Sequence, residues 1–180
     1  MMMSDILELT PAEDLVGNKP PEFDFDNPFM DPKELIDQLW TNMKHYGGVG
    51  LSAPQVGLKT KVFVMGTDDM RLNVFNPQVL TIDDKMDNYK EGCLTWPFLF
   101  LQIKRPKFCL VSYYDETGEA KNMRFEGMTA RVFLHEYDHM MGIDFTQRAS
   151  KLVLERGLKA RDKKLKKLVL QGKLKQRNVA

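Results

Sequence analysis

The order of periodic segments constrains the fold of this chain more than any other feature of its sequence. Between residues 61 and 125, short apolar runs alternate with turn residues, a pattern typical of short strands. Segments with helical spacing of apolar residues lie before and after this region, at about residues 31–46, 127–141 and 149–170. One helix, a run of strands and two further helices predict an α+β fold of short antiparallel sheets around a central helix.

The expected strands are brief and end at turn residues. They lie at residues 61–65, 73–75, 78–82, 101–104, 107–113 and 119–125. The first helix has the clearest ends, because Asp31 can cap it, Pro32 suits its first position, and Gly47 with Gly48 ends it. Residues 10–30 are rich in Pro, Asp and Asn and are expected to be irregular.

Length and composition indicate one ordinary globular domain. The 180 residues fit a single domain, 1–180, whose last part, 150–180, is a basic C-terminal helix or tail. Two cysteines do not make a disulfide framework, so we expect a reducing, cytoplasmic setting. The N-terminus lacks the basic start and apolar run of a signal peptide. The apolar run at residues 96–101 is too short to span a bilayer, so we expect no membrane association.

Charge is distributed unevenly along the chain. Residues 151–180 hold 11 of the 26 Lys and Arg and two acids, a net charge of +9, whereas the preceding residues carry −8. Basic segments of this kind bind nucleic acids or other anionic surfaces. The alternative is a helix whose basic face is simply solvated.

The sequence HEYDH at residues 135–139 is the strongest chemical signal. Side chains four residues apart lie on one face of a helix, so His135 and His139 can bind one metal ion. Glu136 then lies close enough to exchange protons with a metal-bound water molecule. The chain has only three histidines, which makes a chance occurrence on a surface helix the weaker interpretation.

A catalytic metal site needs a third protein ligand and an open position. Phe145 stands where the metzincin pattern places a third histidine. His45 is expected to be solvated near the negative end of the first helix. Acids and the two cysteines remain as candidates. Cys109 alternates within an apolar strand and is expected in the core. Cys93 follows Gly92 at the end of a polar stretch, so it is the better ligand.

Three motifs in sequence order resemble those of the peptide deformylase family. Residues 48–55 read GVGLSAPQ, residues 91–95 read EGCLT and residues 135–139 read HEYDH. The family patterns are G-x-G-x-A-A-x-Q, E-G-C-L-S and H-E-x-x-H, and the resemblance runs from about residue 30 to 155. Departures are Ser52, Thr95 and the apolar stretch at residues 96–101, where many relatives are polar or basic. That stretch leaves the subclass and the preference for the downstream peptide open.

The resemblance implies a metal-dependent hydrolase that removes the N-formyl group from the formyl-methionine of nascent polypeptides. Cys93, His135 and His139 would bind the metal, with water as the fourth ligand. The thiolate should make the metal a milder Lewis acid than a carboxylate or imidazole would. Family behaviour implies Fe(II) as the native ion, with zinc, nickel or cobalt able to replace it.

The resemblance also assigns roles around the metal. Glu136 would be the general base and acid, while the Gln55 amide and the Leu94 backbone N–H would stabilise the oxyanion. A bare backbone at the glycine-rich motif would pair with an extended peptide, and an apolar slot would take the methionine side chain. The residues expected to bind the peptide are Gly48, Val49, Gly50 and Gly92, and those expected to line the slot are Val49, Tyr89, Met128 and Val132.

Two other functions compete with this interpretation. A small zinc endopeptidase would cleave internal peptide bonds and ignore a formyl group, whereas an RNA- or ribosome-binding protein would need no metal. Ribosomal RNA is also the expected partner of the basic tail in a deformylase, as in bacterial relatives. In that helix Leu154, Leu158, Leu165 and Leu168 would form an apolar seam, while Arg161, Lys163, Lys164, Lys166 and Lys167 would project outward.

Overall fold

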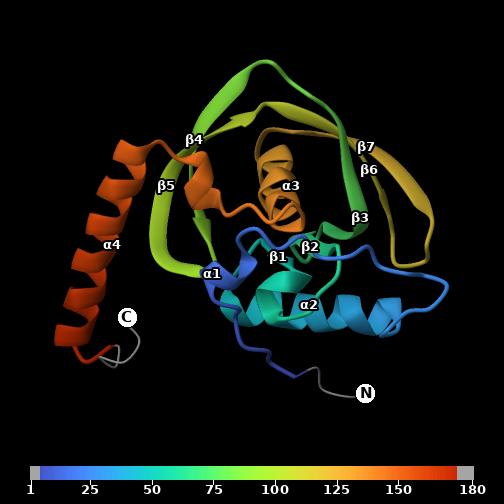
Figure 1. Ribbon diagram of the computed structural model, residues 1–180, viewed down its shortest axis with the longest axis horizontal. Helices are drawn as coiled ribbons and strands as arrows, with labels where there is room; N and C mark the ends of the chain where they lie inside the picture. The colour runs from blue at the N-terminus through green and yellow to red at the C-terminus, as the bar shows by residue number, and fades with distance from the viewer. Residues whose placement is uncertain (1–4, 174–180) are drawn as a thin grey trace.

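The structure, a computed structural model, describes residues 5–173 and is organised around one helix, α3 (Gly127–Met140). Two antiparallel sheets arch over this helix (Figure 1). The five-stranded sheet has the order β1-β2-β3-β6-β7, and the two-stranded sheet pairs β4 with β5. The strands of the two sheets are β1 (Gly50–Ser52), β2 (Val62–Gly66), β3 (Arg71–Ile82), β4 (Met86–Cys93), β5 (Trp96–Pro106), β6 (Phe108–Tyr114) and β7 (Ala120–Glu126). The α+β prediction is confirmed.

Helix α2 (Pro32–Tyr46) begins and ends where the sequence predicts. The Asp31 carboxylate accepts hydrogen bonds from the backbone N–H groups of Lys33 and Glu34, at 2.9 and 3.2 Å. Gly47 ends the helix with a φ of 70°, a left-handed conformation that glycine adopts without a steric penalty. The apolar face of α2 packs under β1 and β2, through Leu35, Ile36, Leu39, Trp40 and Met43.

Strand β3 joins two strands that the sequence analysis treated as separate. Asn76 and Pro77 interrupt the apolar pattern, and the pairing with β6 shifts register after Phe75. Proline donates no ladder hydrogen bond, and a bulge tolerates it. Asn76 adopts a φ of 50°, and its side-chain amide bonds to both the N–H and the C=O of Phe23. The interruption therefore anchors the N-terminal segment.

The β4–β5 hairpin differs most from the expected elements. Strand β4 was not predicted, and β5 begins five residues before the expected strand at residues 101–104. Most of β4 is exposed, so its sequence lacks the alternation that marks a half-buried strand. Pairing with β5 over its whole length holds β4 in place. Helix α1 (Ala12–Leu15) is likewise a short turn inside the segment expected to be irregular.

Helix α4 (Lys151–Leu170) lies along the outer side of β5 (Figure 1). Three of the four leucines of the expected apolar seam are packed: Leu165 is buried, and Leu154 and Leu158 pack against the apolar side chains of β5. The fourth, Leu168, is only partly buried and lies outside this cluster. Gly157 allows this close approach, since a Cβ there would collide with the Leu101 side chain.

One expectation for α4 is wrong. Arg161 does not project outward with the lysines but turns to β5, where its Nε–H donates to the Pro97 carbonyl at 3.0 Å. The Pro97 carbonyl lies within hydrogen-bonding reach of the Arg161 guanidinium, so the side chain bends toward β5. None of the helices within residues 5–173 combines the length and apolar character that a bilayer-spanning segment needs.

Candidate metal centre and its pocket

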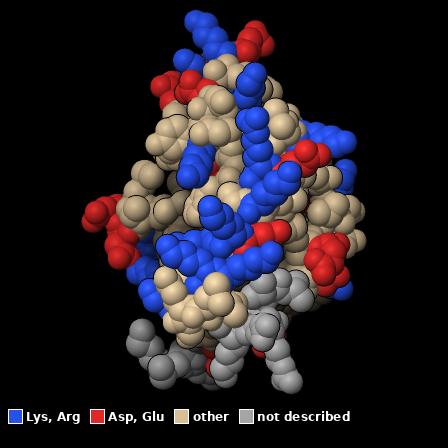
Figure 2. Space-filling model, turned by 90° about the vertical axis from the view of Figure 1, so that its left-hand side faces the viewer, with Lys and Arg blue, Asp and Glu red and all other residues tan. Residues whose placement is uncertain are grey.

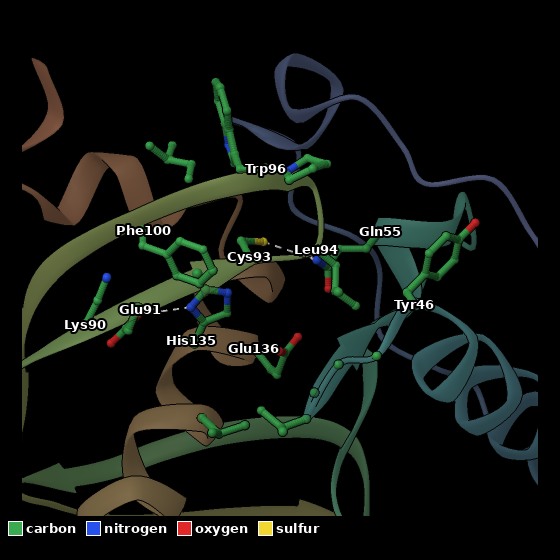
Figure 3. Close-up of a pocket in the computed structure, with 18 of the residues that line it drawn as sticks. Tyr46, Gln55, Lys90, Glu91, Cys93, Leu94, Trp96, Phe100, His135 and Glu136 are labelled. Atoms are coloured by element: carbon green, nitrogen blue, oxygen red, sulfur yellow. Dashed lines mark hydrogen bonds and ion pairs between the residues drawn. The ribbon is translucent and has the colours of Figure 1, made fainter. Parts of the chain in front are cut away.

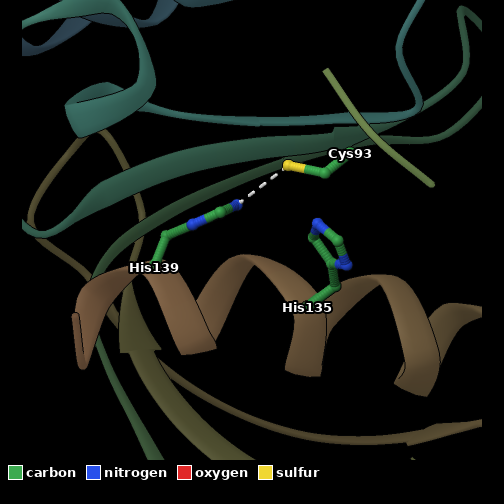
Figure 4. Close-up of side chains that lie close together, drawn as sticks. All are labelled: Cys93, His135 and His139. Carbon is green, nitrogen blue, oxygen red and sulfur yellow. Dashed lines mark hydrogen bonds between the residues drawn. The ribbon is translucent and has the colours of Figure 1, made fainter. Parts of the chain in front are cut away.

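Three side chains converge on one point above α3 (Figure 4). His135 and His139 lie one helical turn apart, and Cys93, at the end of β4, faces them. The Cys93 Sγ and His139 Nε2 atoms are 3.6 Å apart, and all three candidate ligand atoms lie within 4.8 Å of one another. Sulfur and nitrogen ligands of one tetrahedral zinc ion would lie about 3.5 Å apart. The three side chains therefore fit a single metal ion.

Glu91 fixes the orientation of the His135 ring. Its Oε2 atom lies 3.1 Å from His135 Nδ1, which leaves Nε2 free to face Cys93 and His139. A carboxylate bonded to the second ring nitrogen is typical of metal-binding histidines. Burial favours a raised pKa for Glu91, but hydrogen bonds with His135 and Arg105 outweigh it and lower the pKa to about 2. Glu91 is therefore an anion at neutral pH.

A network of buried charges supports Glu91. Arg105 donates to both Glu91 oxygens, at 2.9 and 3.0 Å, and to Asp138 Oδ2 at 2.7 Å. Arg131 donates to Glu91 Oε1 at 2.6 Å, and Arg148 donates to Asp138 Oδ1 at 2.6 Å. Buried charges are tolerated only when paired, so these contacts tie β4, β5 and α3 together behind the candidate metal ligands.

Glu136 is buried directly beside the histidines. Its exposed fraction is 4%, and burial raises the pKa of its carboxyl group to about 7. Its Oε2 atom has no hydrogen-bond partner among the described residues, as is also true of His139 Nδ1. Gly50 of β1 leaves the space that the carboxylate fills, because a Cβ there would collide with Glu136 Oε1. An unpaired carboxylate at this place is suited to bind water or a ligand.

Gln55 points its amide nitrogen at Cys93, one of the three candidate metal ligands. It lies in the short helix η1 (Ala53–Val56), where Ser52 donates to its Oε1 through both N–H and Oγ–H, each at 2.9 Å. The Nε2 group therefore faces the other way, 3.4 Å from Cys93 Sγ and 3.1 Å from Thr95 Oγ1. The hydroxyls of Ser52 and Thr95, the two departures from the family motifs, thus hold the amide orientation.

A cavity of about 700 Å³ opens beside these groups (Figure 3). Helix α3 contributes Met128 and Val132, and the segment leading into β1 contributes its glycine-rich backbone. The opposite wall is the β4–β5 hairpin. A mostly apolar cavity with a few polar groups at one end is typical of a small-molecule or peptide site. Wall residues from the hairpin are Lys90, Gly92, Leu94, Trp96, Pro97, Phe98 and Phe100.

Comparison with known proteins identifies the family. The family model Polypeptide deformylase matches residues 20–155. The peptide deformylase of Thermotoga maritima is 41% identical over 129 residues, which are 70% of this chain and 79% of that protein. The chain belongs to the peptide deformylase family. It is a hydrolase that removes the N-formyl group from nascent polypeptides.

Solved structures of the family share its fold. A peptide deformylase from Synechococcus elongatus in complex with actinonin superposes with a TM-score of 0.79 at 29% identity, covering 89% of each chain. A class I type b peptide deformylase from Acinetobacter baumannii with bound Met-Ala-Ser gives a TM-score of 0.75 at 27% identity. That alignment covers 81% of this chain and 99% of the other.

In this deformylase, most of the residues that the sequence singled out lie together around one cavity. The pocket is lined by Gly48, Val49, Gly50, Gln55, Gly92, Cys93, Leu94, Met128, Val132, His135 and Glu136, and His139 completes the ligand set. Cys109 is fully buried, where desolvation raises its pKa to about 11, and His45 is exposed, as expected for both.

Tyr89 is the exception, because it does not line this cavity. Its ring lies 5.8 Å from the Arg131 guanidinium carbon, and it borders two neighbouring surface hollows instead. Sequence patterns alone indicated no role for Glu91, Arg105 or Asp138. Arg105 was the available signal of the buried charge network, because a charged residue is rare at a core-facing strand position unless it is paired.

Proposed function

We propose that Cys93, His135 and His139 hold one divalent metal ion with which the enzyme hydrolyses the formyl amide of formyl-methionyl peptides. The observation that carries this proposal is the convergence of one thiol and two imidazoles beside the buried Glu136 carboxylate, whose Oε2 atom has no hydrogen-bond partner within residues 5–173. A divalent ion bound there supplies Lewis acidity and an activated water molecule. The orphaned Glu136 oxygen and the Sγ–Nε2 spacing of 3.6 Å support the fit.

The side chains around the metal divide the remaining chemistry. Glu136 accepts the proton of the attacking water and returns it to the departing methionine amine, a role for which its buried position directly beside His135 is suited. The Nε2–H group of Gln55 and the backbone N–H of Leu94 donate to the developing oxyanion, each donor being worth about 3 kcal/mol. Ser52 fixes Gln55 in advance, so no reorganisation accompanies the reaction.

The substrate peptide binds as a strand between two sheet edges. Strand β1 is the outer strand of its sheet, and among the described strands β4 pairs with β5 alone, so both present an edge to the cavity. Backbone groups of Gly48, Gly50 and Gly92 are available there for strand addition. The methionine side chain lies against Met128 and Val132. The related Acinetobacter baumannii enzyme binds a Met-Ala-Ser tripeptide, which supports a methionyl peptide as the ligand of this cavity.

The resident metal is Fe(II) in this proposal, and zinc, nickel or cobalt can take its place. A thiolate with two imidazoles suits each of these ions. We further propose that residues 1–180 form one catalytic domain and that the enzyme works in the cytoplasm, where formylated chains leave the ribosome.

A comparison of formyl-Met-Ala-Ser with acetyl-Met-Ala-Ser tests the reaction. Under anaerobic conditions, the metal-loaded enzyme should release formate at least about 100-fold faster than acetate, because the acetyl methyl group adds bulk beside Glu136 and Gly50. Amine release and formate production measure the two rates. Equal turnover of both peptides, or cleavage of internal peptide bonds, would favour the endopeptidase alternative.

The exposed side of α4 forms a basic surface. Figure 2 shows Lys and Arg side chains gathered over this helix. Lys163, Lys164, Lys166 and Lys167 are all exposed. We propose that this surface docks on ribosomal RNA near the site where nascent chains emerge, since Lys clusters neutralise phosphates at long range.

Charge reversal on α4 tests this docking. Changing Lys163, Lys164, Lys166 and Lys167 to Glu should abolish ribosome co-sedimentation at low salt, because attraction becomes repulsion. A control with the same change in net charge reverses four exposed lysines elsewhere, Lys19, Lys33, Lys59 and Lys85. Turnover of a free formyl-Met tripeptide reports whether each catalytic site is intact. No co-sedimentation of the parent, or equal loss in both variants, would contradict a docking role for α4.

A further inference from the structure

Near the start of β5, where the pairing with β4 shifts register, one residue adopts a backbone conformation that it does not favour. Phe98 has a φ of 65°, in the left-handed region where a residue with a Cβ atom is strained. Strain of this kind persists only where the surrounding structure holds it, and it is concentrated at ligand-binding sites. The conformation therefore raises two questions: what holds it, and what does the Phe98 ring contact.

Helix α4 holds the backbone next to Phe98. Arg161 donates its Nε–H to the Pro97 carbonyl at 3.0 Å, and that carbonyl belongs to the peptide bond preceding Phe98. The Arg161 guanidinium also lies 5.6 Å from the centre of the Trp96 ring. Trp96 is itself fixed, because its Nε1–H donates at 2.9 Å to Asp144, which is 1% exposed. Residues 96–98 are thus clamped from the side of the hairpin facing α4.

The Phe98 side chain lies at the rim of the active-site cavity. It lines the cavity and is 41% exposed, and Phe100 of the same strand is 56% exposed. Across the cavity, Val49 and Met128 are also more than half exposed. Large apolar side chains gathered around a binding cavity mark a surface that a ligand covers.

The extended peptide presents its second side chain to this hairpin. Successive side chains of a strand point to opposite sides. If methionine points to Met128 and Val132 on α3, the next residue points to the other face of the peptide, at the cavity rim that Phe98 and Phe100 line. Lys90 lies 5.3 Å from the centre of the Phe100 ring, so this rim is both apolar and positively charged.

We propose that Phe98 determines specificity for an apolar or aromatic residue directly after the formyl-methionine, and that Arg161 is the positioning residue that holds Phe98 in place. This inference rests on the proposed function, since it concerns the same cavity. A basic second residue is disfavoured by Lys90. The strained backbone is the consequence of placing an aromatic ring where glycine would fit more easily.

Turnover of two tripeptides by Phe98 variants tests the first part. The parent should show a kcat/KM for formyl-Met-Phe-Ser about 10-fold higher than for formyl-Met-Ser-Ser, a typical gain for one added apolar contact. In Phe98→Gly this ratio should fall to near 1, and the melting temperature should not fall, because glycine adopts the φ of 65° without strain. Phe98→Ala removes the ring without adding backbone freedom and should lose the same preference.

The outcomes separate this inference from the proposed function. A parent that deformylates both peptides equally well, or Phe98 variants that keep the parent ratio, would overturn the specificity role and leave the reaction intact. Failure of the parent to deformylate either peptide would overturn the proposed function itself.

Variants of two arginines on α4 test the positioning role. Arg161→Ala should lower the formyl-Met-Phe-Ser preference at least 3-fold through KM, with kcat retained, because Arg161 touches the hairpin and not the reacting atoms. Arg161→Lys keeps a charged donor and should restore part of the preference. The matched control is Arg156→Ala, which removes an exposed arginine of the same helix. Equal ratios in Arg161→Ala and Arg156→Ala would show that Arg161 has no positioning role.

Discussion

Replacing Glu136 with glutamine should lower kcat for formyl-Met-Ala-Ser by at least about 10²- to 10⁴-fold, the contribution of a positioned general base and acid. Glutamine keeps the size of the side chain but can neither accept the proton of water nor return it to the amine. Because Glu136 is not among the three converging ligand atoms, the metal content per chain should match that of the parent. Formate release and elemental analysis of the same preparation measure both quantities.

The Glu136 variant should also remain folded. The Glu136 side chain is buried, and its Oε2 atom has no partner among the described residues, so an uncharged amide should not lower the melting temperature. A folded, metal-loaded Glu136→Gln with near-parental turnover would show that another group carries the proton. Loss of metal in the variant would instead make Glu136 a ligand.

Replacing Cys93 with alanine should remove the metal and with it all measurable turnover. Two imidazoles on one helix cannot enclose an ion. Loss of a residue that merely orients a ligand typically weakens metal binding 10- to 100-fold, or about 1.4–2.8 kcal/mol, and loss of a direct ligand should weaken it more. Elemental analysis after gel filtration measures the loss. The melting temperature should become insensitive to added metal, since binding no longer favours the folded state.

Cys109→Ala is the matched control for the thiol. Cys109 is fully buried in the core between the five-stranded sheet and α3, and desolvation raises its pKa to about 11, so its thiol stays protonated. Its replacement should cost about 1 kcal/mol of stability through the small cavity it leaves, with metal and turnover retained. Equal metal content in Cys93→Ala and the parent would rule out Cys93 as a ligand.

The sequence by itself determined the elements whose signals are local. The ends of α2 follow from Asp31 and Gly47, which act on neighbouring backbone groups. The spacing of His135 and His139 places both imidazoles on one face of a helix wherever that helix lies. Three ordered motifs were sufficient to indicate the family, because each carries residue types that the chemistry requires at fixed spacing.

Only the tertiary structure decided the features that depend on partners distant in sequence. Strand β4 is exposed and polar, so it is a strand because β5 pairs with it and not because of its own pattern. Tyr89 is an exposed residue outside the cavity, near Arg131, which lies 42 positions later and lines the cavity itself. Arg161 turns to β5 because a carbonyl of the hairpin is within reach. Periodicity reports which face of an element is buried, but the identity of what covers that face is set by packing between elements.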